Sequence, residues 1–198
     1  CMMMMSFTKI ILRNMVGLLK IWRNERAFVY LQDKMGENPI KIKVMKILYL
    51  HGLESIGGGK KAEFLSKYHE VEAPIIDYKN HEDILQIEQI LQDYTPELIV
   101  GSSMGGYYAL ILGSIYNIPT LTLNPSIHSR VFEPHFPKFG KNTPHNIICL
   151  GMEDKIIDPD KTLELLPKFH LNNLIIPLHN VGHRFPLSEF ERIYNKLY

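Results

Sequence analysis

From residue 45 to the C-terminus, short apolar runs alternate along the sequence with longer segments of helical spacing. The short runs predict strands at 47–50, 71–76, 98–100, 120–123, 147–150 and 174–176. Helices are predicted at about 59–68, 84–94, 104–116, 159–166 and 190–197. Repeated strand–helix units favour a mostly parallel central sheet with helices on both faces. The predicted class is therefore α/β, with ligands binding where the carboxyl ends of the strands meet.

The strand predicted at 98–100 leads into a G-x-S-x-G motif, residues 101–105, and then into a helical pattern. This order is what a nucleophile elbow requires, because the serine must sit on a sharp turn between a strand and a helix. Glycines on either side of the serine let the backbone and neighbouring elements approach closely. We therefore predict that Ser103 is a nucleophile.

A serine hydroxyl is a weak nucleophile, so it needs a base that takes its proton and a carboxylate that orients the base. Asp154 follows the strand predicted at 147–150, and His183 follows the strand predicted at 174–176. The order Ser103, Asp154, His183 is the chain order of the triad in α/β-hydrolases. Parallel strands bring these positions to the same edge of the sheet, so we predict that the three residues form one catalytic unit.

Other acids and histidines compete for these roles. Glu153 and Asp158 are alternatives for the acid, although Asp158 also suits the cap of the helix beginning at 159. His179 is the alternative base. The remaining histidines are expected to be surface or loop residues: His69, His81, His128, His135, His145 and His170. None of them has a metal-binding spacing, so the sequence implies no metal.

An oxyanion needs preorganised hydrogen-bond donors. One expected donor is the backbone N–H of Met104, the residue after the nucleophile. The other is the backbone N–H of Leu53, in the turn His51-Gly52-Leu53 that follows the first predicted strand.

The glycine-rich stretch 57–59 is followed by Lys60 and Lys61. It does not fit a phosphate-binding P-loop, because Glu54 replaces the first glycine and Lys61 replaces the Ser or Thr. The stretch is either a solvated turn or a place where the lysines contact an anion on the substrate, such as a phosphate.

Taken together, five segments resemble the small YqiA-type esterases of the α/β-hydrolase superfamily over about residues 46–198: 49–55, 101–109, 124–126, the Asp154 loop and 182–185. The resemblance implies an α/β-hydrolase fold with a minimal lid. It also implies a serine esterase that cleaves carboxylic esters or acyl thioesters, with Ser103, Asp154 and His183 as its triad. This chemistry needs no cofactor. A catalytically silent binding protein and an acyltransferase of the same fold remain alternatives.

Residues 124–146 contain four prolines and no clear periodicity, which is unusual for a connection inside a compact domain. The segment also carries Phe132, Phe136 and Phe139. It is either a small cap over the acyl pocket or an inert surface loop.

Residues 1–44 differ from the rest, with eight Lys/Arg and three Asp/Glu against 14 and 18 in residues 45–198. One face of a helix would carry Ile10, Ile11, Met15, Leu18, Leu19 and Trp22. We expect a basic N-terminal extension, amphipathic or disordered and not necessarily native, followed by a hydrolase domain at 45–198. The acidic charge of that domain argues against nucleic-acid binding.

The chain contains two cysteines and no run of some 18 apolar residues. Cys149 lies within an apolar strand pattern and is expected to be a small buried residue. These features favour a reducing, cytoplasmic location without membrane insertion. They leave the oligomeric state open.

Overall fold

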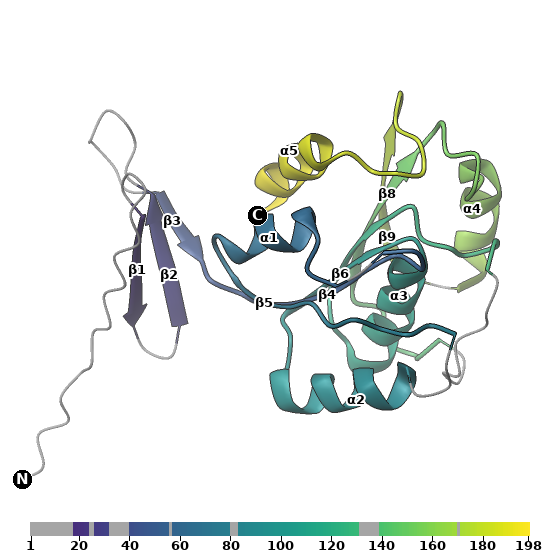
Figure 1. The fold of residues 1–198 in the computed structure, drawn as a ribbon. Helices are drawn as coiled ribbons and strands as arrows, with labels where there is room; N and C mark the ends of the chain where they lie inside the picture. Colours follow the sequence, from purple (N-terminus) through teal and green to yellow (C-terminus); the bar gives the residue numbers. More distant parts are fainter. Residues whose placement is uncertain are drawn as a thin grey trace, which may run out of the picture.

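The computed structural model describes residues 18–23, 26–31, 40–55, 57–79, 83–130, 139–169 and 171–198. Its centre is a six-stranded sheet in the order β5-β4-β6-β7-β8-β9. Figure 1 shows this sheet together with its helices. Every neighbouring pair in this sheet is parallel. The strands are β4 (Lys46–Leu50), β5 (Glu70–Glu72), β6 (Leu98–Ser102), β7 (Thr120–Leu123), β8 (His145–Gly151) and β9 (Asn172–Leu178).

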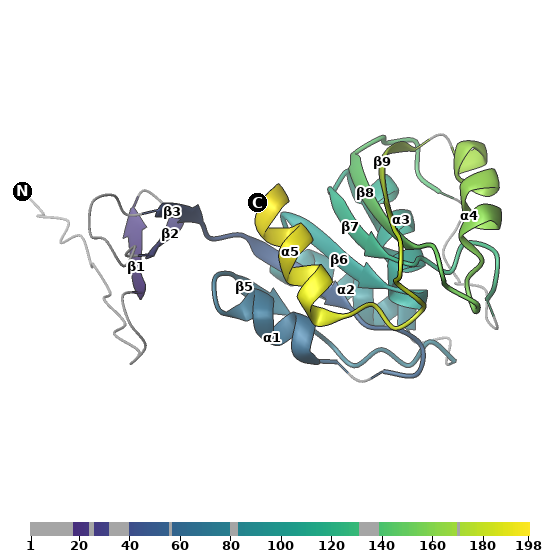
Figure 2. The ribbon, with the colours of Figure 1, turned by 90° about the horizontal axis from the view of Figure 1, so that it is seen from above.

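Helices cover both faces of the sheet, as seen from above in Figure 2. They are α1 (Lys60–Ser66), α2 (Asp83–Tyr94), α3 (Met104–Tyr116), α4 (Pro159–Leu165) with the short 3-10 helix η1 (Leu166–Phe169), and α5 (Leu187–Leu197). Side chains alternate between the two faces of a strand. In β4, Ile47 and Tyr49 therefore pack in the cluster of α1 and α5, whereas Leu48 and Leu50 pack in the cluster of α2 and α3.

The predicted α/β architecture, a parallel central sheet with helices on both faces, is confirmed, and most elements lie within a few residues of their predicted positions. The main difference is β5, which ends at Glu72 instead of continuing to Ile76. It pairs only with the first half of β4, and Pro74 has no N–H to extend the pairing. The backbone N–H of Ile76 instead donates to the side chain of His51.

The described part of the N-terminal region forms a separate antiparallel sheet of β1 (Leu18–Arg23), β2 (Arg26–Leu31) and β3 (Ile40–Lys43). The predicted helical face is therefore wrong for Leu18, Leu19 and Trp22, which lie in β1. The strand pairing of β1 with β2 offers these residues a local alternative to a helix. The rest of the predicted face, Ile10 to Met15, lies outside the described residues.

Within the described residues, none of the helices has the length and apolar character needed to span a bilayer.

Candidate active site

Ser103 lies on the sharp turn between β6 and α3, with φ 54° and ψ −115°. Residues with side chains rarely adopt this backbone conformation, which costs about 1–3 kcal/mol and is typical of functional turns. Tight packing maintains the turn: a Cβ atom on Gly105 would lie 2.3 Å from the carbonyl oxygen of Leu50, and one on Gly101 would lie 2.3 Å from that of Gly105. The G-x-S-x-G spacing is thus explained by the close approach of β6, α3 and β4.

Asp154 and His183 form a hydrogen bond, with 2.8 Å between His183 Nδ1 and Asp154 Oδ2. The Asp154 side chain is 1% exposed and that of His183 is 22% exposed. Asp154 Oδ1 accepts from the backbone N–H groups of Ile156 and Ile157, at 2.8 and 2.9 Å. Because a carboxylate only accepts hydrogen bonds, His183 Nδ1 is the donor to Asp154, and Nε2 is the ring nitrogen that this bond leaves free.

The alternative candidates lie elsewhere. Asp158 caps α4, accepting from the N–H groups of Asp160 and Lys161. Glu153 and His179 are exposed and do not line the cavity that contains Ser103.

His69 lies in the loop between α1 and β5, but it is buried and not at the surface. Its Nδ1 accepts from the backbone N–H of Met45, and its Nε2 lies 2.8 Å from the hydroxyl of Tyr194 in α5. Of the other histidines in that group, His128 is half-buried and His145 is exposed, while His81, His135 and His170 lie outside the described residues.

Ser103 and His183 line one cavity of about 480 Å³ at the carboxyl ends of the strands. Leu53 and Met104, the predicted oxyanion donors, line the same cavity. Met104 is the first residue of α3, so its backbone N–H has no hydrogen-bond acceptor within the helix. The cavity's volume of about 480 Å³ is within the usual range for small-molecule sites.

Ser126 is the hydrogen-bond partner of the Ser103 side chain in the part of the chain that the structure describes, with 3.4 Å between the two hydroxyl oxygens. Its backbone N–H also donates to the carbonyl of Ser103 at 3.0 Å. Within the same described residues, Ser103 and His183 share the cavity without a direct hydrogen bond.

Asn124 holds the loop of His183, a role that the sequence analysis missed. Its Nδ2 donates to the carbonyls of Gly182 and His183, at 3.0 and 3.3 Å, and its Oδ1 accepts from the N–H of Gly151 at 2.6 Å. Asn124 is 2% exposed and has φ 46°, a conformation that asparagine tolerates better than most residues. It thus ties the end of β7 to the end of β8 and to the histidine loop.

The turn that carries Leu53 is fixed by His51. His51 Nε2 accepts from the N–H of Ile76 at 2.9 Å, so its protonated Nδ1 donates to the carbonyl of Gly52 at 2.7 Å. The hydroxyl of Tyr78 donates to the carbonyl of His51. The sequence pointed to this turn but not to the buried contacts that set its geometry.

Residues 46–173 match the uncharacterised protein family UPF0227. This chain belongs to that family. The match confirms the resemblance to YqiA-type proteins noted in the sequence.

Solved structures with the same architecture include a monoacylglycerol lipase of Paleococcus ferrophilus, at 13% identity and a TM-score of 0.59, covering 77% of this chain and 93% of that one. They also include the esterase domain of a Rhodothermus marinus protein, at 16% identity and a TM-score of 0.55, covering 86% and 94%. A third is a Xanthomonas campestris serine hydrolase without a lid, at 14% identity and a TM-score of 0.54, covering 88% and 94%. At these identities the likeness shows the α/β-hydrolase fold.

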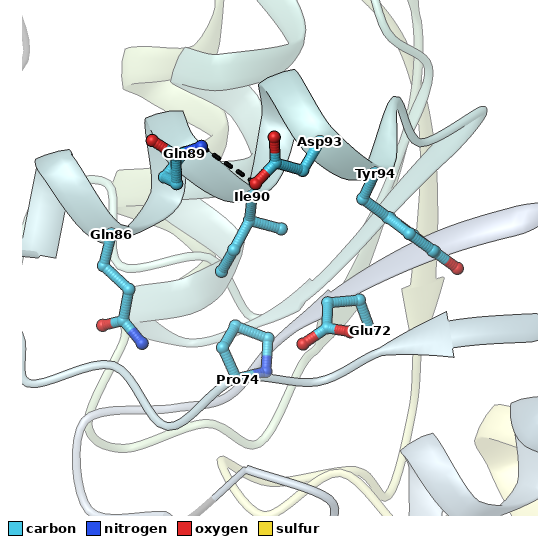
Figure 3. A pocket seen from close by; sticks show the side chains of 7 residues that line it. All are labelled: Glu72, Pro74, Gln86, Gln89, Ile90, Asp93 and Tyr94. Atoms are coloured by element: carbon cyan, nitrogen blue, oxygen red, sulfur yellow. Dashed lines mark hydrogen bonds between the residues drawn. The ribbon is translucent and has the colours of Figure 1, made fainter.

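Besides the Ser103 cavity, the protein has a groove between β5 and α2 (Figure 3). Glu72 and Asp93 line it, and Asp93 accepts a hydrogen bond from Gln89 at 2.9 Å. Its described lining contains no serine and no histidine. The groove therefore lacks the groups that distinguish the Ser103 cavity.

Two further expectations concern single residues. Cys149 is fully buried in β8, as predicted, and burial raises the pKa of its thiol to about 12. Phe139 packs against Tyr107 and Phe169, whereas Phe132 and Phe136 lie outside the described residues.

In the described ranges, no group of three or more His, Cys, Asp or Glu side chains is arranged to hold a metal ion.

Proposed function

We propose that this protein is a serine hydrolase that cleaves carboxylic acyl esters, and acyl thioesters by the same route. Ser103 is the nucleophile, His183 is the general base, and Asp154 orients the imidazole. The observation that carries the proposal is the 2.8 Å hydrogen bond between Asp154 and His183 at the cavity that Ser103 lines.

Asp154 engages Nδ1 of His183, which leaves Nε2 to accept the proton of the Ser103 hydroxyl. The Ser103 oxygen attacks the acyl carbonyl, and the carbonyl oxygen becomes an oxyanion stabilised by the N–H groups of Leu53 and Met104. The protonated His183 then gives its proton to the departing alcohol or thiol, leaving an acyl-enzyme. Water, deprotonated by the same imidazole, attacks the acyl carbonyl. The bond between the acyl group and the Ser103 oxygen then breaks, His183 returns the proton to that oxygen, and the carboxylic acid is released.

The resting hydrogen bond of Ser103 with Ser126 is long, at 3.4 Å, and therefore easily exchanged. Catalytic hydrogen bonds are often looser in the free enzyme and tighten when substrate binds. Rotation of the Ser103 hydroxyl from Ser126 to His183 is the change that the reaction requires.

The first experiment compares Ser103→Ala with the native protein on para-nitrophenyl butyrate. We expect kcat to fall by about 10⁴-fold or more, because the covalent step is lost. Ser188→Ala, at an exposed position on α5, is the matched control and should retain native turnover. Native turnover in the Ser103 variant would refute the proposal.

A fluorophosphonate probe separates an active hydrolase from a silent binding protein of the same fold. The probe should label the native protein and the Ser188 control at Ser103, and it should not label Ser103→Ala. Absence of labelling in the folded native protein would mean that Ser103 is not activated.

A further inference from the structure

The cavity of Ser103 is rich in positive charge. Among the described residues that line it, Lys61, Arg130 and Arg184 are basic and only Glu54 is acidic. Residues 45–198 as a whole are acidic, with 14 Lys/Arg and 18 Asp/Glu. The charge at the cavity is therefore opposite to that of the surrounding domain.

Lys61 is the cation whose setting most strongly indicates a ligand. It lies in the first turn of α1 and is half-buried, and burial lowers the pKa of its ammonium group. Among the residues that the structure describes, no carboxylate forms an ion pair with it, including Glu54 of the same cavity. A partly desolvated ammonium without a counter-ion is unfavourable, and an anion in the cavity would relieve that cost.

Arg130 is held in place before any ligand binds. Its guanidinium donates to the backbone carbonyls of Ser126 and Ile127 and lies over the ring of Tyr107, 4.1 Å from the centroid. Arg184 is exposed and directly follows His183, so it adds a cation on the side of the cavity nearest the proposed base. Because the guanidinium of Arg130 is already fixed, it loses little conformational entropy when it binds an anion.

The groove between β5 and α2 provides a contrast within the same molecule (Figure 3). Two acidic side chains, Glu72 and Asp93, line it, and none of its described lining residues is a lysine or an arginine. Basic side chains therefore line the cavity with the serine and the histidine but not this groove.

We infer that the natural substrate is an ester bearing an anionic group, a carboxylate or a phosphate, which Lys61, Arg130 and Arg184 hold while Ser103 reacts. This inference rests on the proposed hydrolase function and specifies its substrate class. It also assigns a role to Lys61, one of the two lysines after the glycine-rich turn.

The test uses two pairs of matched esters and the complete protein. In the first pair, mono-para-nitrophenyl glutarate carries a carboxylate on the acyl side and para-nitrophenyl pentanoate is its neutral counterpart. In the second pair, para-phosphonooxyphenyl butyrate carries a phosphate on the alcohol side and phenyl butyrate is neutral. For each pair, kcat/KM of the anionic ester is divided by kcat/KM of its neutral counterpart. The pair with the larger ratio shows which anion, and which side of the ester, the cations contact.

We expect a ratio of about ten in at least one pair, because one charge-assisted contact is worth roughly this factor. Lys61→Met should reduce that ratio about tenfold, mainly through KM, and Lys61→Arg should restore most of it. Lys60→Met is the matched control, because Lys60 is exposed on the same helix and does not line the cavity. This control should keep the native ratio.

A second measurement needs no variant. Raising the salt concentration from about 0.05 M to about 0.5 M should shrink the native ratio, because the attraction is screened. Ratios of one or less in both pairs, with Ser103-dependent hydrolysis of the neutral esters, would overturn this inference and leave the proposed function intact. No Ser103-dependent hydrolysis of any of the four esters would overturn both.

Discussion

Replacing Asn124 with alanine should impair both stability and turnover, although this side chain does not touch the proposed nucleophile. Three hydrogen bonds disappear, to the N–H of Gly151 and to the carbonyls of Gly182 and His183. The Gly151 N–H is buried and is left without its partner, which costs about 1–3 kcal/mol. The two carbonyls are less buried and add about 1 kcal/mol together, and alanine at φ 46° adds up to about 1 kcal/mol.

The free energy of unfolding should therefore fall by about 3 kcal/mol, which corresponds to a lower Tm by roughly 10 °C for a domain of this size. Urea titration followed by circular dichroism measures the first quantity and thermal melting the second. Because the His183 loop loses its link to β7, kcat for para-nitrophenyl butyrate should fall by about 10²-fold, with a smaller change in KM.

Asn117→Ala is the matched control. Asn117 also has a left-handed backbone, with φ 57°, but it ends α3 at an exposed position outside the cavity lining. The control should lose about 1 kcal/mol of stability and keep its kcat. If Asn124→Ala loses stability but keeps kcat within about twofold of native, Asn124 does not position His183. If neither quantity changes, the hydrogen-bond argument itself is wrong.

Three further predictions concern packing, strain and burial. Gly105→Ala should lower the free energy of unfolding, measured by urea titration, by about 3 kcal/mol or more, because the new Cβ would lie 2.3 Å from the carbonyl oxygen of Leu50. Gly59→Ala is the control: its Cβ would meet nothing within 4 Å, so its free energy of unfolding should stay within about 0.5 kcal/mol of native. Ser103→Gly should be more stable than Ser103→Ala by about 1 kcal/mol, since glycine relieves the strain at φ 54°; equal stabilities would argue against strain. Burial raises the pKa of the Cys149 thiol to about 12, so the protonated thiol stabilises the folded protein fully below pH 9, and this stabilisation is lost as the pH rises from about 9 towards 12. The free energy of unfolding of the native protein should therefore decline more steeply in that range than that of Cys149→Ala. Parallel curves for the two proteins would contradict this.

The parts of the site that the sequence predicted share one property: they follow from local pattern and strand order. The G-x-S-x-G motif between an apolar run and a helix placed Ser103 on a turn, and Asp154 and His183 each followed a predicted strand. Because all six strands of the central sheet are parallel, positions that follow them lie at one edge. Spacing along the chain was therefore enough to bring these residues together in the prediction.

Residues whose partners lie far away in sequence could not be predicted in the same way. His69 was expected to be a surface or loop residue; it lies in a loop, but it is buried against Tyr194, 125 residues away. Asn124 was assigned no role and was noted only within the segment 124–126, yet its side chain donates to the carbonyl of Gly182, 58 residues away. Nothing in the local pattern of a polar residue indicates which distant atom will satisfy it once it is buried.

By itself, the sequence determined that this protein has an α/β fold with a serine on a strand–helix turn, because hydrophobic period and glycine spacing are local properties of the chain. Only the tertiary structure decided which carboxylate forms a hydrogen bond with His183, where β5 stops, and which of the two adjacent lysines lines the cavity. Those outcomes depend on how burial distributes hydrogen bonds and charge among segments that meet only after the sheet has formed.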